Sequence, residues 1–283
     1  MKQSKKKNKL SGEEQFNEYY EALFGGRWEI LRNSLSKEAD SRKYIVRAGC
    51  EPYFLDSASI RAAAALPLAN AHNILDLCAA PGGKTLVLAS LMNDDANLLS
   101  NERSFERKMR LDKVCATCLP PTIKERVRVI NKDGAKLCLA NENESFFDAI
   151  LLDAPCSSER HVFNDRKYLD EWSPSRIKTL AIAQWSLLSS AWRMLKEGGF
   201  ILYSTCALNK TENDDIIRKL LKKFTEARLV EPKISNDISA FAEKLPEYEK
   251  TEFGAHILPD ASGGAGPLYF SLLQKPAQTD ENK

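Results

Sequence analysis

The chain has 283 residues, of which 43% are hydrophobic and 28% charged, and its formal net charge is +2. This length suits one large domain, or one domain with a small extension, and the hydrophobic content is sufficient for a core. No apolar run approaches the roughly 18 residues of a membrane-spanning helix, and the first residues are too polar for a signal peptide. We therefore expect a cytoplasmic protein without membrane contacts.

The N-terminal part is predicted to be a basic arm followed by helices. Residues 2–9 contain five lysines and no acidic residue. Such an arm is either a solubilising tail or a contact to nucleic acid, and its composition does not decide between the two. Residues 13–35 carry apolar side chains at helical spacing, and Gly25 and Gly26 separate two helices. We expect a basic arm and a helical extension over residues 1–50.

The central part is predicted to alternate between strands and helices. A helix over residues 59–66 ends at Pro67, and short continuous apolar runs follow it. Such runs are typical of strands buried on both faces, and their alternation with helices is typical of a parallel sheet. The predicted strands are 73–77, 96–101, 126–131, 147–153 and 199–205, and the predicted helices are 84–92, 103–118, 175–195 and 211–224.

The last apolar segments complete the expected fold. Residues 252–259 and 267–274 have no helix between them, which predicts an antiparallel pair at the sheet edge. The expected fold class is therefore α/β, with a mostly parallel, doubly wound sheet in a domain over residues 51–275 and a polar tail over residues 276–283. In such sheets ligands bind beyond the carboxyl ends of the strands.

The loop after the first parallel strand reads CAAPGGKT and is a candidate cofactor site. Its small residues let the backbone approach a ligand, and the following helix N-terminus offers unpaired N–H groups. The loop nearly matches the P-loop pattern of nucleoside triphosphatases. However, Cys78 replaces the first glycine, and Pro81 removes an N–H donor. We favour a cofactor with a ribose, and a P-loop NTPase is the alternative enzyme.

Three acids stand at the ends of successive predicted strands: Asp76, Glu102 and Asp133. Glu102 is placed to accept hydrogen bonds from ribose hydroxyls, and Asp133 to meet an adenine amino group. Each acid alone is commonly a helix N-cap, but three at successive strand ends favour a ligand site. The G-x-G-x-x-G pattern is absent, which favours S-adenosylmethionine over NAD.

Two cysteines occupy similar places after two strands. Cys156 stands in a Pro-Cys-Ser turn after the strand that ends at Asp153, and Cys206 stands in a Ser-Thr-Cys turn after the next strand. A lone cysteine at a strand end is commonly a small buried hydrophobe, but two such turns favour a reaction centre. The seven scattered cysteines argue against a disulfide framework.

We do not predict a metal site. Cys115 and Cys118 form a single C-x-x-C within a predicted helix, and no second pair completes a zinc site, so we interpret them as packing residues. The three histidines, His72, His161 and His256, share no metal-binding spacing.

The segments DLCAAPGGKT, DAPCS and YSTCAL together resemble the cytosine-5 RNA methyltransferases of the NOL1/NOP2/Sun family, also called the RsmB/RsmF type, over about residues 50–274. The segments YFLDSASIRAAAALPL and ILPDASGGAGPLYF are most similar to its mitochondrial ribosomal-RNA branch. The resemblance implies a Rossmann-like class I methyltransferase fold, S-adenosylmethionine as cofactor and RNA as substrate, with rRNA preferred over tRNA. A protein specificity partner is a further expectation. A catalytically inactive RNA-binding subunit is the non-enzymatic alternative.

The resemblance also implies roles for individual residues. Cys206 is expected to attack C6 of cytosine, because a thiolate is a strong, soft nucleophile near neutral pH. Cys156 is expected to assist release of the product, Asp153 to hydrogen-bond the base near N3, and Lys84 to approach the same centre. The expected cofactor-binding residues are Cys78, Ala79, Ala80, Pro81, Gly82, Gly83, Lys84, Glu102, Asp133 and Asp153.

The chain departs from the common family pattern in one place. The family commonly has a glycine after Pro-Cys-Ser, whereas Ser157 is followed here by Ser158, Glu159, Arg160 and His161. The mitochondrial branch has a similar polar continuation. We expect Arg160 and His161 to contact RNA.

Overall fold

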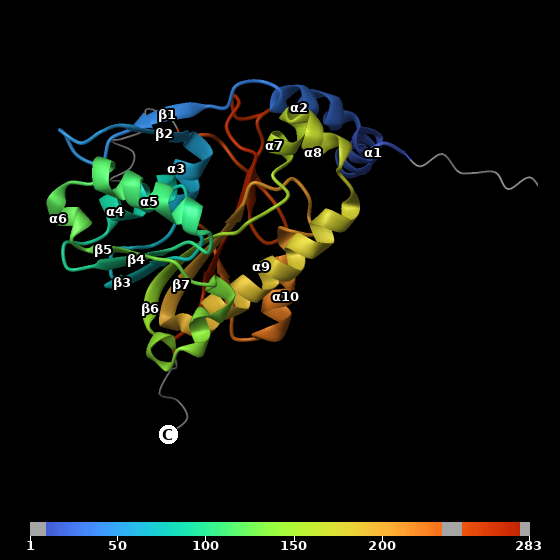
Figure 1. The fold of residues 1–283 in the computed structure, drawn as a ribbon. Helices are drawn as coiled ribbons and strands as arrows, with labels where there is room; N and C mark the ends of the chain where they lie inside the picture. The colour runs from blue at the N-terminus through green and yellow to red at the C-terminus, as the bar shows by residue number, and fades with distance from the viewer. Residues whose placement is uncertain (1–9, 234–244, 278–283) are drawn as a thin grey trace, which may run out of the picture.

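A central β-sheet organises the molecule, which the computed structural model describes over residues 10–233 and 245–277 (Figure 1). Its strands are β3 (Asn73–Asp76), β4 (Asn97–Asn101), β5 (Val127–Ile130), β6 (Phe147–Asp153), β7 (Leu195–Thr205), β8 (Arg228–Val230), β9 (Glu249–Lys250), β10 (Ala255–Ile257) and β11 (Leu268–Gln274). They lie in the order β5-β4-β3-β6-β7-β11-β10-β9, and β8 pairs with β11 beside this path. The first five are parallel and the remaining strands pair antiparallel, as predicted from the apolar runs.

Alternate residues of the inner parallel strands enter two separate hydrophobic layers. On β6, Ala149 and Leu151 belong to one layer, and Ile150 and Leu152 belong to the other. All four side chains are fully buried, so the strand has no polar face. This burial on both faces explains why the strands are continuous apolar runs in the sequence.

Helices cover both faces of the sheet (Figure 1). The first layer contains residues of α3 (Ser57–Ala64), α4 (Gly83–Leu91) and α5 (Phe105–Cys118), and the short α6 (Pro121–Lys124) follows α5. The second layer contains residues of α9 (Pro174–Met194) and α10 (Asp214–Lys223). The 3-10 helix η2 (Gly134–Leu139) packs against this layer, and a second 3-10 helix, η3 (Asn141–Asn143), follows it in the chain. The helices predicted in the parallel part are thus confirmed, with ends displaced by a few residues. None of the helices in the described ranges is long and apolar enough to cross a membrane.

Some elements were not predicted. Residues Ser41–Tyr44 (β1) and Tyr53–Asp56 (β2) form a separate antiparallel pair. The sequence does not predict this pair, because β1 carries mainly exposed polar side chains and lacks an apolar run. The strand predicted at 199–205 begins at Leu195, because Leu195 pairs with Phe147 before a bulge. The lysines of residues 2–9 lie outside the described residues.

The helical extension packs on the main domain through aromatic side chains. It consists of α1 (Gly12–Phe24), a 3-10 turn η1 (Gly25–Arg27) and α2 (Trp28–Leu35), so the predicted break at the two glycines is confirmed. Phe16 lies at the centre of this packing, with its ring 4.7 Å from that of Tyr20, 5.7 Å from Trp28 and 5.3 Å from Trp172. The two short helices α7 (Glu159–Asn164) and α8 (Arg166–Asp170) supply the opposing surface.

We expect Phe16→Ala to lower the free energy of unfolding by about 3–5 kcal/mol, because it removes a fully buried aromatic ring and leaves a cavity. Ile30→Ala in α2 is the control, since Ile30 is 62% exposed, and it should change stability by no more than about 0.5 kcal/mol. Urea unfolding followed by circular dichroism measures both. Equal losses in the two variants would contradict the proposed packing of the extension.

Candidate active site

The site lies where the sheet order reverses. From β3 the chain proceeds outward through β4 and β5, then returns to β6 on the other side of β3. Loops leaving neighbouring strands at such a point diverge and open a crevice beyond their carboxyl ends. A cavity of about 980 Å³ occupies this position, which is within the usual size of a ligand site.

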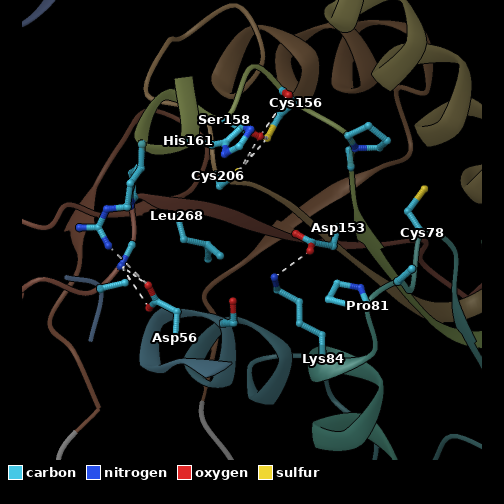
Figure 2. Close-up of a pocket in the computed structure, with 18 of the residues that line it drawn as sticks. Asp56, Cys78, Pro81, Lys84, Asp153, Cys156, Ser158, His161, Cys206 and Leu268 are labelled. Atoms are coloured by element: carbon cyan, nitrogen blue, oxygen red, sulfur yellow. Dashed lines mark hydrogen bonds and ion pairs between the residues drawn. The ribbon is translucent and has the colours of Figure 1, made fainter. Parts of the chain in front are cut away.

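The pairing of β6 with β7 brings the two cysteine turns together. The strands are parallel and in register, with Asp153 opposite Ser204. The turn after each strand therefore leaves the sheet at the same level. The sulfur atoms of Cys156 and Cys206 lie 3.0 Å apart, and both face the cavity (Figure 2).

Most of the predicted site residues line this one cavity. Figure 2 shows Lys84 and Pro81 on the side of α4, with Asp153 across from them and the two thiols above. The predicted site residues in the lining are Cys78, Ala80, Pro81, Lys84, Asp153, Cys156 and Cys206, together with the expected RNA contacts Arg160 and His161. Ala79 and Gly83 line a smaller cavity of about 180 Å³ that shares Lys84 and Asp153.

The two thiols have opposite protonation preferences. The thiol of Cys156 donates to Cys206 and thereby lowers the pKa of Cys206, while burial acts in the opposite direction. The hydroxyl of Ser158, 3.3 Å from the sulfur of Cys206, lowers that pKa further. The same hydrogen bond to Cys206, together with burial, raises the pKa of Cys156. Cys206 is therefore the thiol that is poised to become a thiolate.

Ser158 adopts a backbone conformation that favours glycine. Its φ of 56° lies in the left-handed region, and it occupies the position where the family commonly has glycine. In this conformation, its hydroxyl oxygen lies 3.3 Å from the sulfur of Cys206 and 3.6 Å from the sulfur of Cys156. The departure from the family pattern thus adds a polar contact to both thiols. The serine in place of glycine is visible in the sequence, but nothing there indicates its contact with the thiols.

The carboxylate of Asp153 is oriented by two contacts. The ammonium of Lys84 lies 2.8 Å from one oxygen, and the hydroxyl of Ser204 donates to the other at 2.8 Å. Burial disfavours the charge of Lys84, but the attraction of Asp153 outweighs it and raises the pKa of Lys84. The side chain of Asp153 keeps 32% of its surface exposed, so it remains accessible from the cavity.

The cofactor loop is held close to the sheet. The N–H of Ala79 donates to Asn101 at the end of β4, and the φ of Gly82 is 120°. A Cβ on Gly82 would also lie 3.0 Å from a methyl of Val114, so both conformation and space require glycine there. Asp76 below the loop is fully buried, and burial raises its pKa to about 7. One of its oxygens has no hydrogen-bond partner within the described ranges, whereas Thr85 donates to the other.

Glu102 and Asp133 lie outside the lining of the main cavity. Glu102 is 4% exposed, and its carboxylate accepts the N–H of Ser104 and lies 3.4 Å from Arg107, which does line the cavity. Asp133 accepts the N–H of Ala135 as the N-cap of η2 and borders a different cavity. The structure therefore brings Glu102 near the cofactor loop through Arg107 and places Asp133 further along the sheet.

Arg160 and Asp56 form part of the opposite wall. The guanidinium of Arg160 donates to the carbonyl of Gly264 at 2.9 Å and lies 4.0 Å from Asp56. Asp56 caps α3 and also accepts the N–H of Gly266, and burial raises its pKa. Arg160 thus joins three segments of the chain, whereas the neighbouring His161 is exposed at the cavity rim.

Two of the remaining cysteines lie inside the protein. Cys115 and Cys118 are buried in the first hydrophobic layer, so their interpretation as packing residues is confirmed. Within residues 10–233 and 245–277, no group of three or more potential ligands is arranged to hold a metal ion.

The sheet order, the cavity at its reversal and the two cysteine turns define a Rossmann-like domain of the methyltransferase class. More particularly, the chain belongs to the RsmB/F family: a family model described as 16S rRNA methyltransferase RsmB/F matches residues 63–274. The predicted family and fold class are thereby confirmed.

Individual relatives agree with this family. The chain is 30% identical over 233 residues to the 5-cytosine rRNA methyltransferase NSUN4 of Xenopus laevis, covering 79% of this chain and 56% of the relative. It is 31% identical over 231 residues to the mitochondrial tRNA (cytosine(34)-C(5))-methyltransferase of Mus musculus, covering 80% of this chain and 64% of the relative. The chain therefore spans less than two thirds of either relative.

One solved structure has a similar fold. The crystal structure of NSun6 from Pyrococcus horikoshii, with the S-adenosylmethionine analogue SFG, matches with a TM-score of 0.60 and 24% sequence identity. The match covers 80% of this chain and 53% of that chain. At this identity the likeness concerns the fold.

We expect Ser158→Gly to raise the pKa of Cys206, because the variant loses a hydroxyl that lowers it. Stability should be unchanged or increase by about 1 kcal/mol, since glycine relieves the left-handed conformation. The measurement is the rate of alkylation of Cys206 by iodoacetamide against pH, followed by mass spectrometry.

Ser145→Gly is the matched control for this prediction. Ser145 also has a positive φ, 49°, but borders neither thiol. It should gain similar stability without changing the alkylation profile. The assignment is wrong if Ser158→Gly leaves the Cys206 profile at its wild-type position.

Proposed function

We propose that this chain is an S-adenosylmethionine-dependent RNA (cytosine-C5)-methyltransferase that acts through a covalent bond between Cys206 and C6 of the base. The observation that carries the proposal is the shared cavity, in which the Cys156–Cys206 pair faces Asp153 and the loop that begins at Cys78. Membership of the RsmB/F family supports the same reaction. The site thus contains the thiol nucleophile that methylation of a cytosine ring at C5 requires.

The reaction needs a nucleophile because C5 of cytosine does not take a methyl group unaided. A bond between the thiolate of Cys206 and C6 moves the electrons of the C5–C6 double bond toward C5 and makes that carbon nucleophilic. Cys206 suits this step, because its neighbours lower its pKa. Asp153 hydrogen-bonds the base near N3, and Lys84 and Ser204 keep its carboxylate in place.

Cys156 assists the return to free enzyme. After C5 has been methylated, it gives its proton to solvent, and the electrons of the C5–H bond restore the C5–C6 double bond. The bond between Cys206 and C6 breaks in the same step, with its electron pair returning to sulfur. The thiol of Cys156 keeps its own proton and lies 3.0 Å from Cys206. Its hydrogen bond therefore stabilises the departing thiolate. Loss of Cys156 is expected to slow release more than attack.

The loop of residues 78–84 is proposed to hold S-adenosylmethionine, which supplies the methyl group when bound. One carboxylate oxygen of Asp76, which has no hydrogen-bond partner among the described residues, fits a polar ligand at this position. Cys78, Pro81 and Lys84 border both the main and the smaller cavity. The cofactor analogue named for archaeal NSun6 supports the same cofactor. Cys78 in place of the first P-loop glycine continues to disfavour an NTPase.

Ribosomal RNA is the preferred substrate, because the family description and the NSUN4 relative both name rRNA. Transfer RNA is the second candidate, because the mouse relative is named for it. The exposed His161 at the cavity rim is a proposed RNA contact, and a protein partner is proposed to contribute specificity. Bisulfite sequencing of total RNA from a strain that lacks the gene tests whether the substrate is rRNA or tRNA. Loss of a methylcytosine in tRNA alone would make tRNA the substrate and would contradict the preference for rRNA.

The two cysteines should fail in different ways. We expect Cys206→Ala to lose methylation and to form no adduct, because the attacking sulfur is absent. Cys156→Ala should still attack and methylate, then remain attached to RNA, because the departing thiolate is less stabilised. The measurement is a protein–RNA band that survives SDS and disappears after nuclease digestion. Calorimetry should show cofactor binding in both variants.

Two outcomes would contradict this assignment. A stable adduct with Cys206→Ala, and none with Cys156→Ala, would mean that the roles are reversed. Full methylation by both variants would remove the cysteines from the mechanism. Cys138→Ala is a matched control, because Cys138 is a partly buried free thiol in η2 and outside the cavity.

We also expect Glu102→Ala and Asp133→Ala each to weaken binding of S-adenosylmethionine by about 1–3 kcal/mol, the range for loss of one partner from a buried polar contact. Isothermal calorimetry measures the affinity. Asp165→Ala is the matched control for Asp133, because Asp165 is also an N-cap, at the start of α8. If Asp133→Ala and Asp165→Ala bind the cofactor equally well, Asp133 is an N-cap only. Unchanged affinity in both Glu102→Ala and Asp133→Ala would refute their assignment.

A further inference from the structure

Two glutamates lie fully buried behind the cysteine turns, and the proposed reaction does not use them. Glu159 follows Cys156 by three positions along the chain, and Glu212 follows the turn of Cys206. Both have no exposed surface, and neither lines the cavity. The hydroxyl of Ser157, the residue next to Cys156, contacts the carboxylates of both. Neither glutamate has a cationic partner among the described residues, and this needs an explanation because burying charge is costly.

Glu212 holds the backbone beside Cys156. Its carboxylate accepts the backbone N–H of Ser157 at 3.0 Å. It also accepts the side-chain amides of Gln184 and Asn209, each at 2.7 Å. The amide of Gln184 in addition donates to the carbonyl of Pro155 at 2.9 Å, on the other side of Cys156. All the contacts of this carboxylate within the described residues are with donors, so the NH2 group of an amide at this position would face other donors.

Glu159 holds the backbone beside Cys206 in the reciprocal way. It accepts the backbone N–H of Leu208, two residues after Cys206, at 3.1 Å. The phenol hydroxyl of Tyr20, in α1 of the extension, donates to its other oxygen. Each glutamate therefore belongs to the segment after one cysteine and binds the segment after the other. This crossed pattern ties the two turns together independently of the sheet.

A single proton on this pair is sufficient to let the two carboxylates lie buried side by side. Burial and the nearby charge of Glu212 raise the pKa of Glu159 to about 7, so Glu159 takes up a proton near neutral pH. The hydroxyl of Ser157 contacts both carboxylates but has a single hydrogen to donate. A proton on Glu159 would let that acid donate to the Ser157 oxygen while the hydroxyl hydrogen serves Glu212. The titratable groups that face this pair include Tyr20 and Tyr19 from α1, Tyr203 from β7, and the thiols Cys156 and Cys206 from the turns.

We propose that Glu159 and Glu212 are positioning residues that set the separation of the two thiols, and that Tyr20 of the helical extension completes their arrangement. The extension then contributes to thiol chemistry, besides contributing to packing. The inference rests on the proposed function, because it concerns the same pair of cysteines. Its test is the reactivity of Cys206 in the absence of RNA and cofactor, which does not depend on which reaction the protein catalyses.

The experiment uses the full chain and measures alkylation of Cys206 by iodoacetamide against pH. Glu212→Gln should lower the rate near pH 7 at least about tenfold, corresponding to a rise of one unit in the pKa of Cys206. The reason is that an amide group would face donors and displace the Ser157 backbone. Glu159→Gln should retain more reactivity than Glu159→Ala, because an amide reproduces the donor and the acceptor of a protonated acid.

Tyr20→Phe is the mild variant that keeps the test decisive if the glutamate variants do not fold. It should shift the Cys206 profile in the same direction by a smaller amount, because it removes only the hydroxyl. Tyr44→Phe is the matched control, since Tyr44 is also buried and its hydroxyl contacts Ser90 of α4, in neither cysteine turn. Tyr44→Phe should leave the profile unchanged.

The possible results separate the two proposals. Lower stability with a wild-type alkylation profile in Glu212→Gln and Tyr20→Phe would mean that the glutamates serve packing only, and would overturn the inference. A shifted profile supports it. If the profile shifts but the wild-type chain methylates no RNA, the proposed function fails and the positioning role stands.

Discussion

The parallel pairing of β6 with β7 is the constraint on which the site depends. Because Asp153 lies opposite Ser204, the chain leaves both strands at the same edge, and the two cysteine turns have to meet. The contact of 3.0 Å between the sulfurs and the orientation of Asp153 by Ser204 both follow from this register. A shift of one residue between the strands would turn these side chains to the opposite face of the sheet.

Much of this arrangement follows from local sequence patterns. Strands buried on both faces need continuous apolar runs, so β3 to β7 and the parallel sheet could be predicted from the sequence. The carboxyl ends of parallel strands lie at the same edge of a sheet, so Asp153, Cys156 and Cys206 could be assigned to one site from the sequence alone. The break between α1 and α2 could likewise be predicted from Gly25 and Gly26, because glycine disfavours the continuation of a helix.

The remainder depends on contacts that sequence spacing does not encode. Tyr20 meets Glu159 across 139 positions of sequence, and no local pattern distinguishes that tyrosine from Tyr19 beside it. Ser158 takes a left-handed conformation without being glycine, so its contact with Cys206 has no compositional signal. Asp133 illustrates the opposite case, in which a strand-end acid caps η2 outside the main cavity and its role toward the cofactor stays a prediction.

The depth of the thiols has a consequence for the architecture of the RNA. Cys156 and Cys206 are both half-buried, and both line the cavity together with Ser158 and Asp153. A cytosine that is stacked and paired within a duplex presents its edge to a groove and cannot place C6 against such a sulfur. Under the proposed function, the target base has to leave its stack, which costs least in loops, bulges and junctions. The shape of the cavity would therefore select targets by local RNA flexibility before any base sequence is read.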